Sequence, residues 1–420
     1  MQSSSPSTPK SQNDHILLLP FLAQGHLRPF LHLAHFLNSH TPFSITLLTT
    51  PLNAANLRRQ NPHPSITIVD LPFNPLELGL PPNTENTERI PLTSIITLFN
   101  ATKSLEPHLR AYLTRHHHQT PPICIVFDIF LGWADNVARS FGSTGICFNT
   151  GGAYGLAAYT SIWNYLPHKN ISDDEEEFSL PGFPEDRKFR RNQFHRFLRF
   201  ADGSDDWSKF FQPHIRLSMK CSGWLCNTVE EIEPLGFEVL RNSLKLPVWG
   251  IGPLIGSSSD DGKNDDEGCV EWLNKFKEDS VLFVCFGSQN TVNPIQMMEL
   301  AKGLEESNVP FLWVIRPPFG FDINDEVKPE WLPEGFEARV KEKKQGKLVR
   351  RWAPQLEILR NEATGGFLSH CGWNSVMEGL REGVPIIGWP LAAEQAYNSK
   401  MLVEEMGWRS RWRGVWMGGD

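Results

Sequence analysis

Residues 352–395 read WAPQLEILRNEATGGFLSHCGWNSVMEGLREGVPIIGWPLAAEQ, and this stretch decides how the second half of the chain folds. The apolar run at 365–368 leads into the turn SHCG at 369–372, and apolar residues then recur at helical spacing from Val376 to Leu380. This order predicts a buried strand, a turn broken by glycine and the start of a helix. Backbone N–H groups and the positive end of the helix dipole converge at such a start, so we expect an anionic phosphate there.

The side chains around this turn suit a nucleotide sugar. An aromatic face can stack on a base, a carboxylate can bind a vicinal diol, and imidazole, amide and hydroxyl groups can donate to phosphate. Taken singly, Trp352 and Trp373 would be explained as core aromatics and Glu378 as part of a solvated helix face. Their occurrence together in one register favours a binding site.

The whole stretch resembles, without a gap, the signature box of the plant UDP-dependent glycosyltransferases of family 1. That resemblance implies a GT-B fold, in which two Rossmann-like domains with doubly wound parallel sheets face one another across a cleft. It also implies a UDP-sugar as donor. Glucose is the expected sugar, because family members that use glucose usually end the box in Gln, as at Gln395. The preceding residue is usually Asp in the family, and Glu394 leaves the choice of sugar open.

The resemblance also implies which residues bind the donor. Trp352 would stack on uracil, Gln355 would approach the nucleoside and Glu378 would hold the ribose hydroxyls. The residues that would contact the diphosphate are His370, Asn374 and Ser375. Ala353 and Trp373 are further donor-binding candidates, with no particular part of the donor assigned to them. The residues that would hydrogen-bond the sugar hydroxyls are Glu394 and Gln395.

Outward from the box, short apolar runs alternate with helical patterns in both halves of the chain, which predicts parallel, doubly wound sheets. The predicted strands are 16–19, 44–48, 66–69, 123–127, 146–148, 281–286, 311–315, 347–349 and 385–387. In such sheets a ligand binds outside the carboxyl ends of the strands. Gly287-Ser288 follows the strand VLFVCF at that end, where Ser288 could donate to a phosphate, although a plain turn would explain it as well.

A chain of 420 residues is too long for one ordinary core, which predicts two domains. The segment GIGPLIGSSSDDGKNDDEG, which begins at Gly250, is rich in Gly, Ser and Asp and reads as a linker. We therefore expect an acceptor-binding domain at 1–250, a linker at 251–268 and a UDP-sugar-binding domain at 269–407.

His26 and Asp128 are the candidate catalytic residues, and each lies just beyond or at the end of a predicted strand. An imidazole can take a proton from an acceptor hydroxyl, and a carboxylate on its other nitrogen fixes the tautomer and stabilises the imidazolium. A lone His after a strand is usually structural, and Asp128 could simply cap the next helix. The resemblance assigns His26 the role of general base and Asp128 that of its partner.

These roles imply a single displacement at the anomeric carbon, with inversion of configuration. Gly25, Asn149, Thr150, Gly151 and Gly152 follow strands of the same half and are candidates for the pocket of a hydroxyl-bearing phenolic, flavonoid or terpenoid. A turn explains the stretch from Asn149 to Gly152 equally well. No Asp-x-Asp pair ends a strand, so we expect no metal ion and no cofactor besides the UDP-sugar.

Composition narrows the class of protein. The net charge of −8 gives no basic excess for binding nucleic acid. The seven cysteines form no zinc-ligand spacing and include residues inside apolar runs, which is typical of a reducing compartment. No window has the apolar length of a membrane span and the first residues do not form a signal peptide, so we expect a cytoplasmic protein.

The last residues, 408–420, read WRSRWRGVWMGGD and show neither helical nor strand periodicity. Because a shift of one nucleotide would turn the Trp codons into residues common in the family, we expect a frameshifted tail; a natural short isoform is the alternative. Family members carry further elements after the box, including a helix that returns to the first domain. A catalytically impaired UDP-sugar-binding relic is therefore a second interpretation. A third is a related two-domain epimerase or phosphorylase, and Trp352 together with Glu378 argues against that one.

Overall fold

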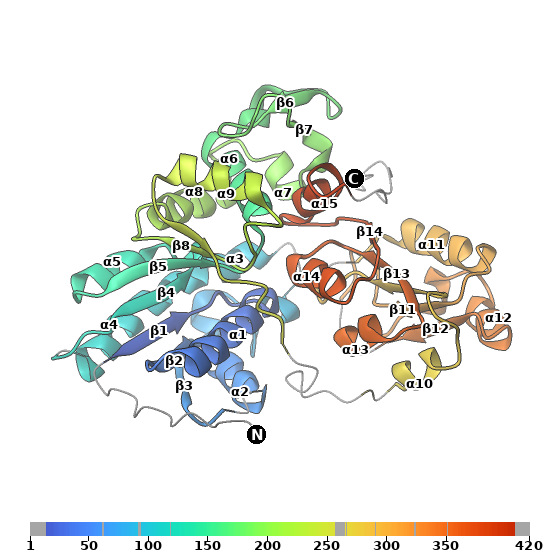
Figure 1. Ribbon diagram of the computed structural model, residues 1–420, viewed down its shortest axis with the longest axis horizontal. Helices are drawn as coiled ribbons and strands as arrows, with labels where there is room; N and C mark the ends of the chain where they lie inside the picture. Colours follow the sequence, from blue (N-terminus) through green and yellow to red (C-terminus); the bar gives the residue numbers. More distant parts are fainter. Residues whose placement is uncertain are drawn as a thin grey trace, which may run out of the picture. The chain divides into compact units, whose positions relative to one another are not determined.

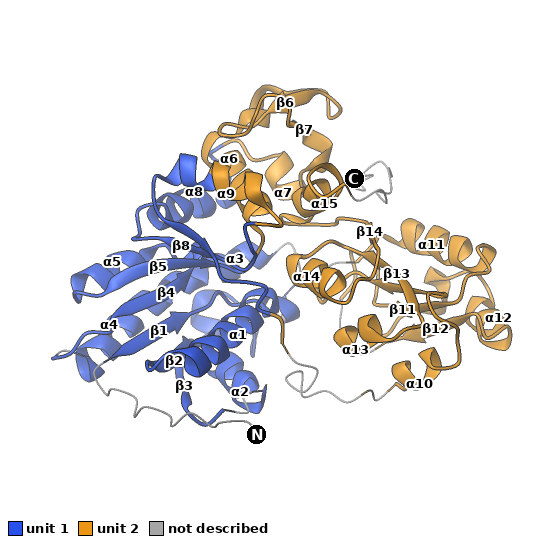
Figure 2. Ribbon diagram, in the orientation of Figure 1, with its two compact units in different colours: residues 1–150, 203–230, 240–254 blue, residues 151–202, 231–239, 255–420 orange. Residues whose placement is uncertain are grey.

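The computed structural model describes residues 14–60, 63–90, 94–117, 119–256, 265, 267–289, 291–322, 325–350 and 352–407. The chain forms two compact units (Figure 2). Unit 1 consists of residues 1–150, 203–230 and 240–254, and unit 2 of residues 151–202, 231–239 and 255–420. The units are interleaved along the chain, and the predicted domain boundaries stay a prediction. The predicted tail at 408–420 lies outside the described residues, as do 257–264 of the predicted linker.

Unit 1 contains a seven-stranded parallel sheet in the order β3-β2-β1-β4-β5-β8-β9 (Figure 1). Its strands are β1 (His15–Leu19), β2 (Ser44–Thr49), β3 (Ile66–Asp70), β4 (Cys124–Asp128), β5 (Thr144–Asn149), β8 (Trp224–Cys226) and β9 (Val248–Gly250). Its helices are α1 (Gln24–His40), α2 (Pro51–Gln60), α3 (Ile95–Ala101), α4 (Leu105–His116), α5 (Trp133–Ser140) and α8 (Asp206–Ser218). The central strand HILLL is apolar on both faces because helices cover both sides of a doubly wound sheet.

Unit 2 contains a five-stranded parallel sheet in the order β12-β11-β10-β13-β14. Its strands are β10 (Val281–Cys285), β11 (Phe311–Val314), β12 (Gly346–Val349), β13 (Thr364–Ser369) and β14 (Ile386–Gly388). The helices that follow these strands or precede them are α10 (Cys269–Leu273), α11 (Pro294–Glu306), α12 (Phe336–Glu342), α13 (Gln355–Arg360), α14 (Trp373–Arg381) and α15 (Gln395–Glu404). The two Rossmann-like parallel sheets predicted from the sequence are therefore confirmed.

Unit 2 also includes elements that precede the predicted linker in the chain (Figure 2). These are α6 (Ala153–Tyr165), the hairpin of β6 (Glu177–Ser179) and β7 (Lys188–Arg190), α7 (Arg196–Arg199) and the first part of α9 (Pro234–Leu244). α6 packs against α15. Most of α6 is buried because its sequence, AYGLAAYTSIWNY, is apolar or small on every face.

The strand order places a topological switch point in each sheet, and ligands of open α/β sheets bind at such points. In unit 1 the switch point lies between β1 and β4, which pair in parallel with Leu19 beside Phe127. In unit 2 it lies between β10 and β13, where Cys285 is beside Ser369. The candidate residues His26 and Asp128 therefore follow or end the two strands of one switch point, and Ser288 and His370 follow those of the other.

Candidate functional site

The turn between β13 and α14 is built differently from the glycine-broken turn that we predicted. The left-handed residue is Cys371, with φ of 61°, whereas Gly372 has φ of −59° and directly precedes the helix. The Cys371 N–H donates to Ser369 Oγ at 3.1 Å, and its carbonyl accepts from Asn398 Nδ2 at 3.0 Å. A non-glycine residue held in this conformation by its neighbours is a feature that clusters at functional sites.

Glycine is needed at 372 because of its neighbour and not because of its backbone angle. A Cβ at Gly372 would lie 2.4 Å from His370 Nε2, and a Cβ at Gly287, after β10, would lie 2.7 Å from the same atom. The two glycines therefore form a cradle for the imidazole at the switch point. Burial in this cradle lowers the pKa of His370 to about 4, so the ring is neutral at physiological pH.

The residues predicted to bind the nucleoside and the diphosphate come together on α13 and α14. Gln355 Nε2 donates to Ser375 Oγ at 2.9 Å and to Glu378 Oε2 at 2.7 Å. Trp352 is half-buried, just before α13, and Ala353 is buried. Ser375 and Glu378 lie one turn apart on α14, so a ribose and a phosphate could be bound along one helix edge.

The two residues predicted to bind the sugar lie at the start of α15. Gln395 Oε1 accepts from the N–H groups of Leu391 and Ala392, at 2.8 and 2.7 Å. This fixes the amide so that its NH₂ group is directed away from those two N–H groups. Glu394 is half-buried, and its Oε1 lies 3.4 Å from Asn398 Nδ2. Both positions are compatible with binding hydroxyl groups.

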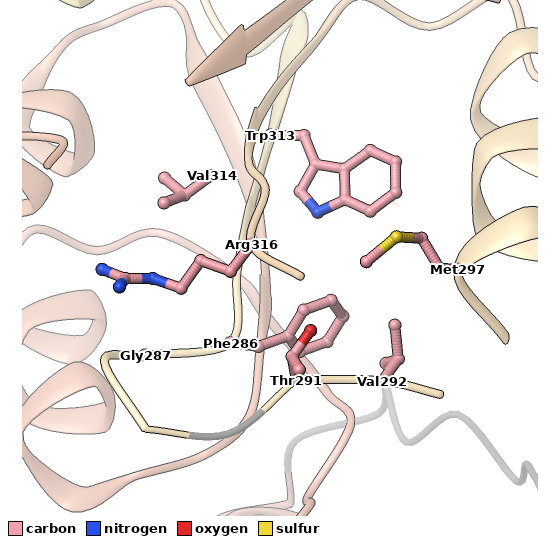
Figure 3. Close-up of a pocket in the computed structure, with 8 residues that line it drawn as sticks. All are labelled: Phe286, Gly287, Thr291, Val292, Met297, Trp313, Val314 and Arg316. Atoms are coloured by element: carbon pink, nitrogen blue, oxygen red, sulfur yellow. The ribbon is translucent and has the colours of Figure 1, made fainter. Parts of the chain in front are cut away.

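Ser288 is half-buried in the turn after β10, beside a small cavity. The cavity is lined by Phe286, Gly287, Thr291, Val292, Met297, Trp313, Val314 and Arg316. Figure 3 shows the side chains of Met297, Trp313 and Phe286 gathered on one side, while the guanidinium of Arg316 points away from them. Its lining thus combines apolar side chains with Thr291 and Arg316, and none of the predicted donor-binding residues is among the residues that line it.

In unit 1, His26 and Asp128 form a hydrogen-bonded pair. His26 Nδ1 lies 2.6 Å from Asp128 Oδ2, and the side chain of His26 is 23% exposed while that of Asp128 is fully buried. Asp128 Oδ1 accepts from the N–H of Phe130 at 3.1 Å, in the short 3-10 helix Ile129–Leu131. A carboxylate accepts from Nδ1–H, which leaves the lone pair on Nε2. This is the orientation that a general base acting through Nε2 requires.

Thr150 and Phe130 are further contacts of this pair. Thr150 Oγ1 lies 3.4 Å from His26 Nδ1, and the ring of Phe130 lies 5.5 Å from that of His26. Thr150 was predicted only as a lining residue of the acceptor pocket, because it follows β5 as His26 follows β1. Phe130 gives no such signal in the sequence, because it reaches His26 only through the turn that Asp128 caps.

The predicted acceptor residues differ in position. Asn149 ends β5 and is buried, Gly25 is exposed in the first turn of α1, and Gly151 is half-buried where the chain enters unit 2. Within the described part of the chain, no group of three or more His, Cys, Asp or Glu side chains could hold a metal ion. Likewise, no helix among those residues combines the length and the apolar character needed to cross a bilayer.

Comparisons with known proteins agree with this architecture. The family model for UDP-glucoronosyl and UDP-glucosyl transferases matches residues 256–410. Crocetin glucosyltransferase 3 of Crocus sativus is 44% identical over an alignment of 410 positions, which covers 94% of this chain and 86% of that protein.

Solved structures of other proteins are also similar to the structure of this chain. UGT73P12 of Glycyrrhiza uralensis, complexed with glycyrrhetinic acid 3-O-monoglucuronide, has a TM-score of 0.82 at 29% identity, covering 97% of this chain and 84% of the other. UGT2 of Phytolacca americana, complexed with UDP-2fluoro-glucose and pterostilbene, has a TM-score of 0.75 at 31% identity, covering 95% and 85%.

The fold and these similarities define an enzyme class, the nucleotide-sugar-dependent glycosyltransferases. Within that class, the chain belongs to the plant family 1 UDP-glycosyltransferases. The resemblance of the box at 352–395 to this family's signature is thereby confirmed. An epimerase or phosphorylase is not supported.

Proposed function

We propose that this enzyme transfers glucose from UDP-glucose, with inversion, to a hydroxyl group of a small, flat plant metabolite. The observation that carries the proposal is the pair formed by His26 and Asp128 at the switch point of the first sheet, because its geometry leaves Nε2 able to accept a proton. The relatives support transfer of a sugar to a small metabolite: one is named a crocetin glucosyltransferase, and one solved structure holds a UDP-sugar analogue together with pterostilbene.

In the proposed reaction, His26 Nε2 takes the proton of the acceptor hydroxyl as its oxygen attacks the anomeric carbon. The new glycosidic C–O bond forms while the bond from that carbon to the diphosphate oxygen breaks, so UDP leaves with the bonding electrons. The imidazolium that forms is stabilised by the buried carboxylate of Asp128. Attack from the face opposite UDP inverts the configuration.

The start of α14 is proposed to bind the diphosphate and to stabilise the charge that develops on UDP. The positive end of a helix dipole and the N–H groups of a first turn favour an anion. Asn374 and Ser375 supply side-chain donors there, and Ser288 and the neutral His370 follow the strands of the same switch point. On this basis we propose that catalysis needs no metal ion, and kcat should be unchanged when the assay contains EDTA.

The neutral state of His370 leads to a prediction about pH. An imidazole with an ordinary pKa near 6.5 would gain a positive charge on acidification and bind a diphosphate more tightly. His370 has a pKa of about 4, so it should contribute a neutral hydrogen bond throughout the neutral range. The Kd of UDP-glucose, whose phosphoryl groups do not titrate there, should stay constant between about pH 6.5 and pH 8.

Isothermal titration calorimetry of UDP-glucose, without acceptor, measures this dependence. As a control, the same titration with His370→Gln should give a similarly flat profile, because the amide retains a neutral donor. A Kd that weakens by about tenfold as the pH rises through that range would show that His370 binds as a cation.

Aromatic rings beside His26 support a flat acceptor. We call Phe21, Phe99, Phe130, Trp207 and Phe211 the aromatic wall. Its rings contact one another at centroid distances between 4.5 and 5.9 Å, and those of Phe21 and Phe130 lie 5.4 and 5.5 Å from that of His26. The half-buried members, Phe130 and Trp207, keep part of their faces accessible. Such faces favour conjugated acceptors over polar ones.

Phe130→Ala should raise the KM of a flat phenolic acceptor by about tenfold, because the variant loses the stacking surface beside the base. The backbone N–H that donates to Asp128 is retained, so the pair of His26 and Asp128 should keep its geometry. The Kd of UDP should be unchanged, because the residues proposed to bind UDP belong to unit 2. Phe130→Tyr keeps the ring face and is the matched control, with a KM close to that of the native enzyme. An acceptor KM unchanged in Phe130→Ala would exclude this ring from the acceptor site.

The overall proposal is tested with the purified chain, UDP-glucose and a panel of phenolic, flavonoid and terpenoid alcohols. Release of UDP together with a product heavier by one hexose is the expected result. Binding of UDP without any product would instead support the impaired relic, which the relatives do not favour. We also propose a cytoplasmic location, because no disulfide joins the seven cysteines, all of which lie in the described part of the chain, as expected in a reducing compartment.

A further inference from the structure

Glu233 is a buried carboxylate outside both the donor box and the catalytic pair. Its side chain lies at the start of α6, where Oε2 accepts from the Ala153 N–H at 2.9 Å and Oε1 from the Tyr154 N–H at 3.0 Å. The residue is 1% exposed. A carboxylate that binds both first N–H groups of a helix and faces the positive end of its dipole fixes that helix start strongly.

Gly152, directly before α6, is where this capped helix start meets the donor box. A Cβ at Gly152 would lie 2.7 Å from both carboxylate oxygens of Glu233 and 2.8 Å from Cη2 of Trp373. Trp373 is the first residue of α14 and is 3% exposed. Its indole therefore packs directly on the α6 start, and glycine is required there because no side chain would fit.

A second contact joins α6 to the other end of the box. A Cβ at Gly155 would lie 2.4 Å from Asn398 Oδ1 and 3.5 Å from Cγ of Glu394. Asn398, which is fully buried, also donates from Nδ2 to the carbonyl of Cys371, in the turn before α14. Gly152 before α6 and Gly155 within it thus lie against the two ends of the box that we propose bind the diphosphate and the sugar, all within unit 2.

We propose that Glu233 is a positioning residue for the donor: by capping α6 it holds Gly152 against Trp373, and so it sets the orientation of the α14 start that binds the diphosphate. The inference rests on the proposed role of α14 in diphosphate binding. Glu233 touches neither donor nor acceptor and acts through α6. The contacts described above join it to the start of α6 and, through Gly152, to the first residue of α14.

The experiment compares Glu233→Gln with the native enzyme, using UDP and uridine as probes. A glutamine has one acceptor oxygen for two N–H groups, so one of them would face an NH₂ group and the cap would loosen. The Kd of UDP should rise by about tenfold, whereas that of uridine, which lacks the diphosphate, should change by less than about twofold. Calorimetry measures UDP, and ligand-observed NMR measures the weaker uridine.

Gly152→Ala tests the same contact from the other side. Its Cβ would displace Trp373 or the carboxylate of Glu233, so the Kd of UDP should again rise by about tenfold while that of uridine stays nearly unchanged. Gly346→Ala is the matched control, because its Cβ would lie 2.5 Å from Cζ of Phe311, at the opposite end of the unit 2 sheet. That variant should lower the Tm and leave both Kd values unchanged.

The outcomes separate the hypotheses. A native enzyme that fails to bind UDP would overturn the proposed donor site and this inference with it. If the native enzyme binds UDP and Glu233→Gln binds it equally well, the inference alone is overturned. If Glu233→Gln raised the Kd values of UDP and uridine equally, the inference would also be overturned, because general damage to unit 2 would affect the binding of both probes.

Discussion

Replacing His26 with alanine is expected to lower kcat by about 10²- to 10⁴-fold, the usual contribution of a positioned general base. The loss follows from the geometry of unit 1, in which Asp128 accepts from Nδ1 and leaves Nε2 as the basic nitrogen. The Kd of UDP should not change, because the residues proposed to bind the donor belong to unit 2. Product formation under saturating UDP-glucose and acceptor measures kcat, and calorimetry measures the Kd.

His40→Ala is the matched control for this substitution. His40 ends the same helix, is exposed, and bonds only to the Phe36 carbonyl among the contacts of its ring nitrogens, so kcat should stay within about twofold. If His26→Ala retained more than about a tenth of the native kcat, His26 would not be the base. The chemistry would then have to use the intrinsic acidity of the acceptor.

Asp128→Asn should be the more damaging of two changes at that position, with a loss of about 10⁴-fold in kcat. The N–H of Phe130 donates to Oδ1, so the oxygen of the new amide must stay on that side. Its NH₂ group then faces His26 Nδ1 and forces that nitrogen to accept. The proton of the imidazole moves to Nε2, which can no longer take a proton from the acceptor.

Asp128→Ala provides the comparison, because it removes the partner without imposing a tautomer. His26 could then still present a basic Nε2 for part of the time, and kcat should fall by only about 10²-fold. Thermal unfolding of both variants shows whether the fold is retained, since Asp128 is fully buried. An alanine variant slower than the asparagine variant, with both folded, would contradict the tautomer argument.

The donor half was largely predictable from the sequence because its residues are close together in the chain. Trp352, Gln355, Ser375 and Glu378 fall within one short stretch, and a strand, a turn and a helix in that order can bring them together by local geometry. The predicted glycine, Gly372, does lie in this turn, but the left-handed residue is Cys371, and Gly372 is needed for the approach of His370. The second glycine beside His370, Gly287, follows a different strand, so that contact could not be predicted from the box alone.

By itself, the sequence determined the alternation that makes two parallel sheets, the residue types of the donor box, and the positions of His26 and Asp128 at strand ends. Local periodicity and strand-end position carry that information. Only the tertiary structure shows that Phe130 and Thr150 lie beside Asp128 and His26, and that burial keeps His370 neutral. The same is true of the hydrogen bond by which Glu233 binds the start of α6. Those properties arise from burial and from contacts between segments distant in the chain, which no single segment encodes.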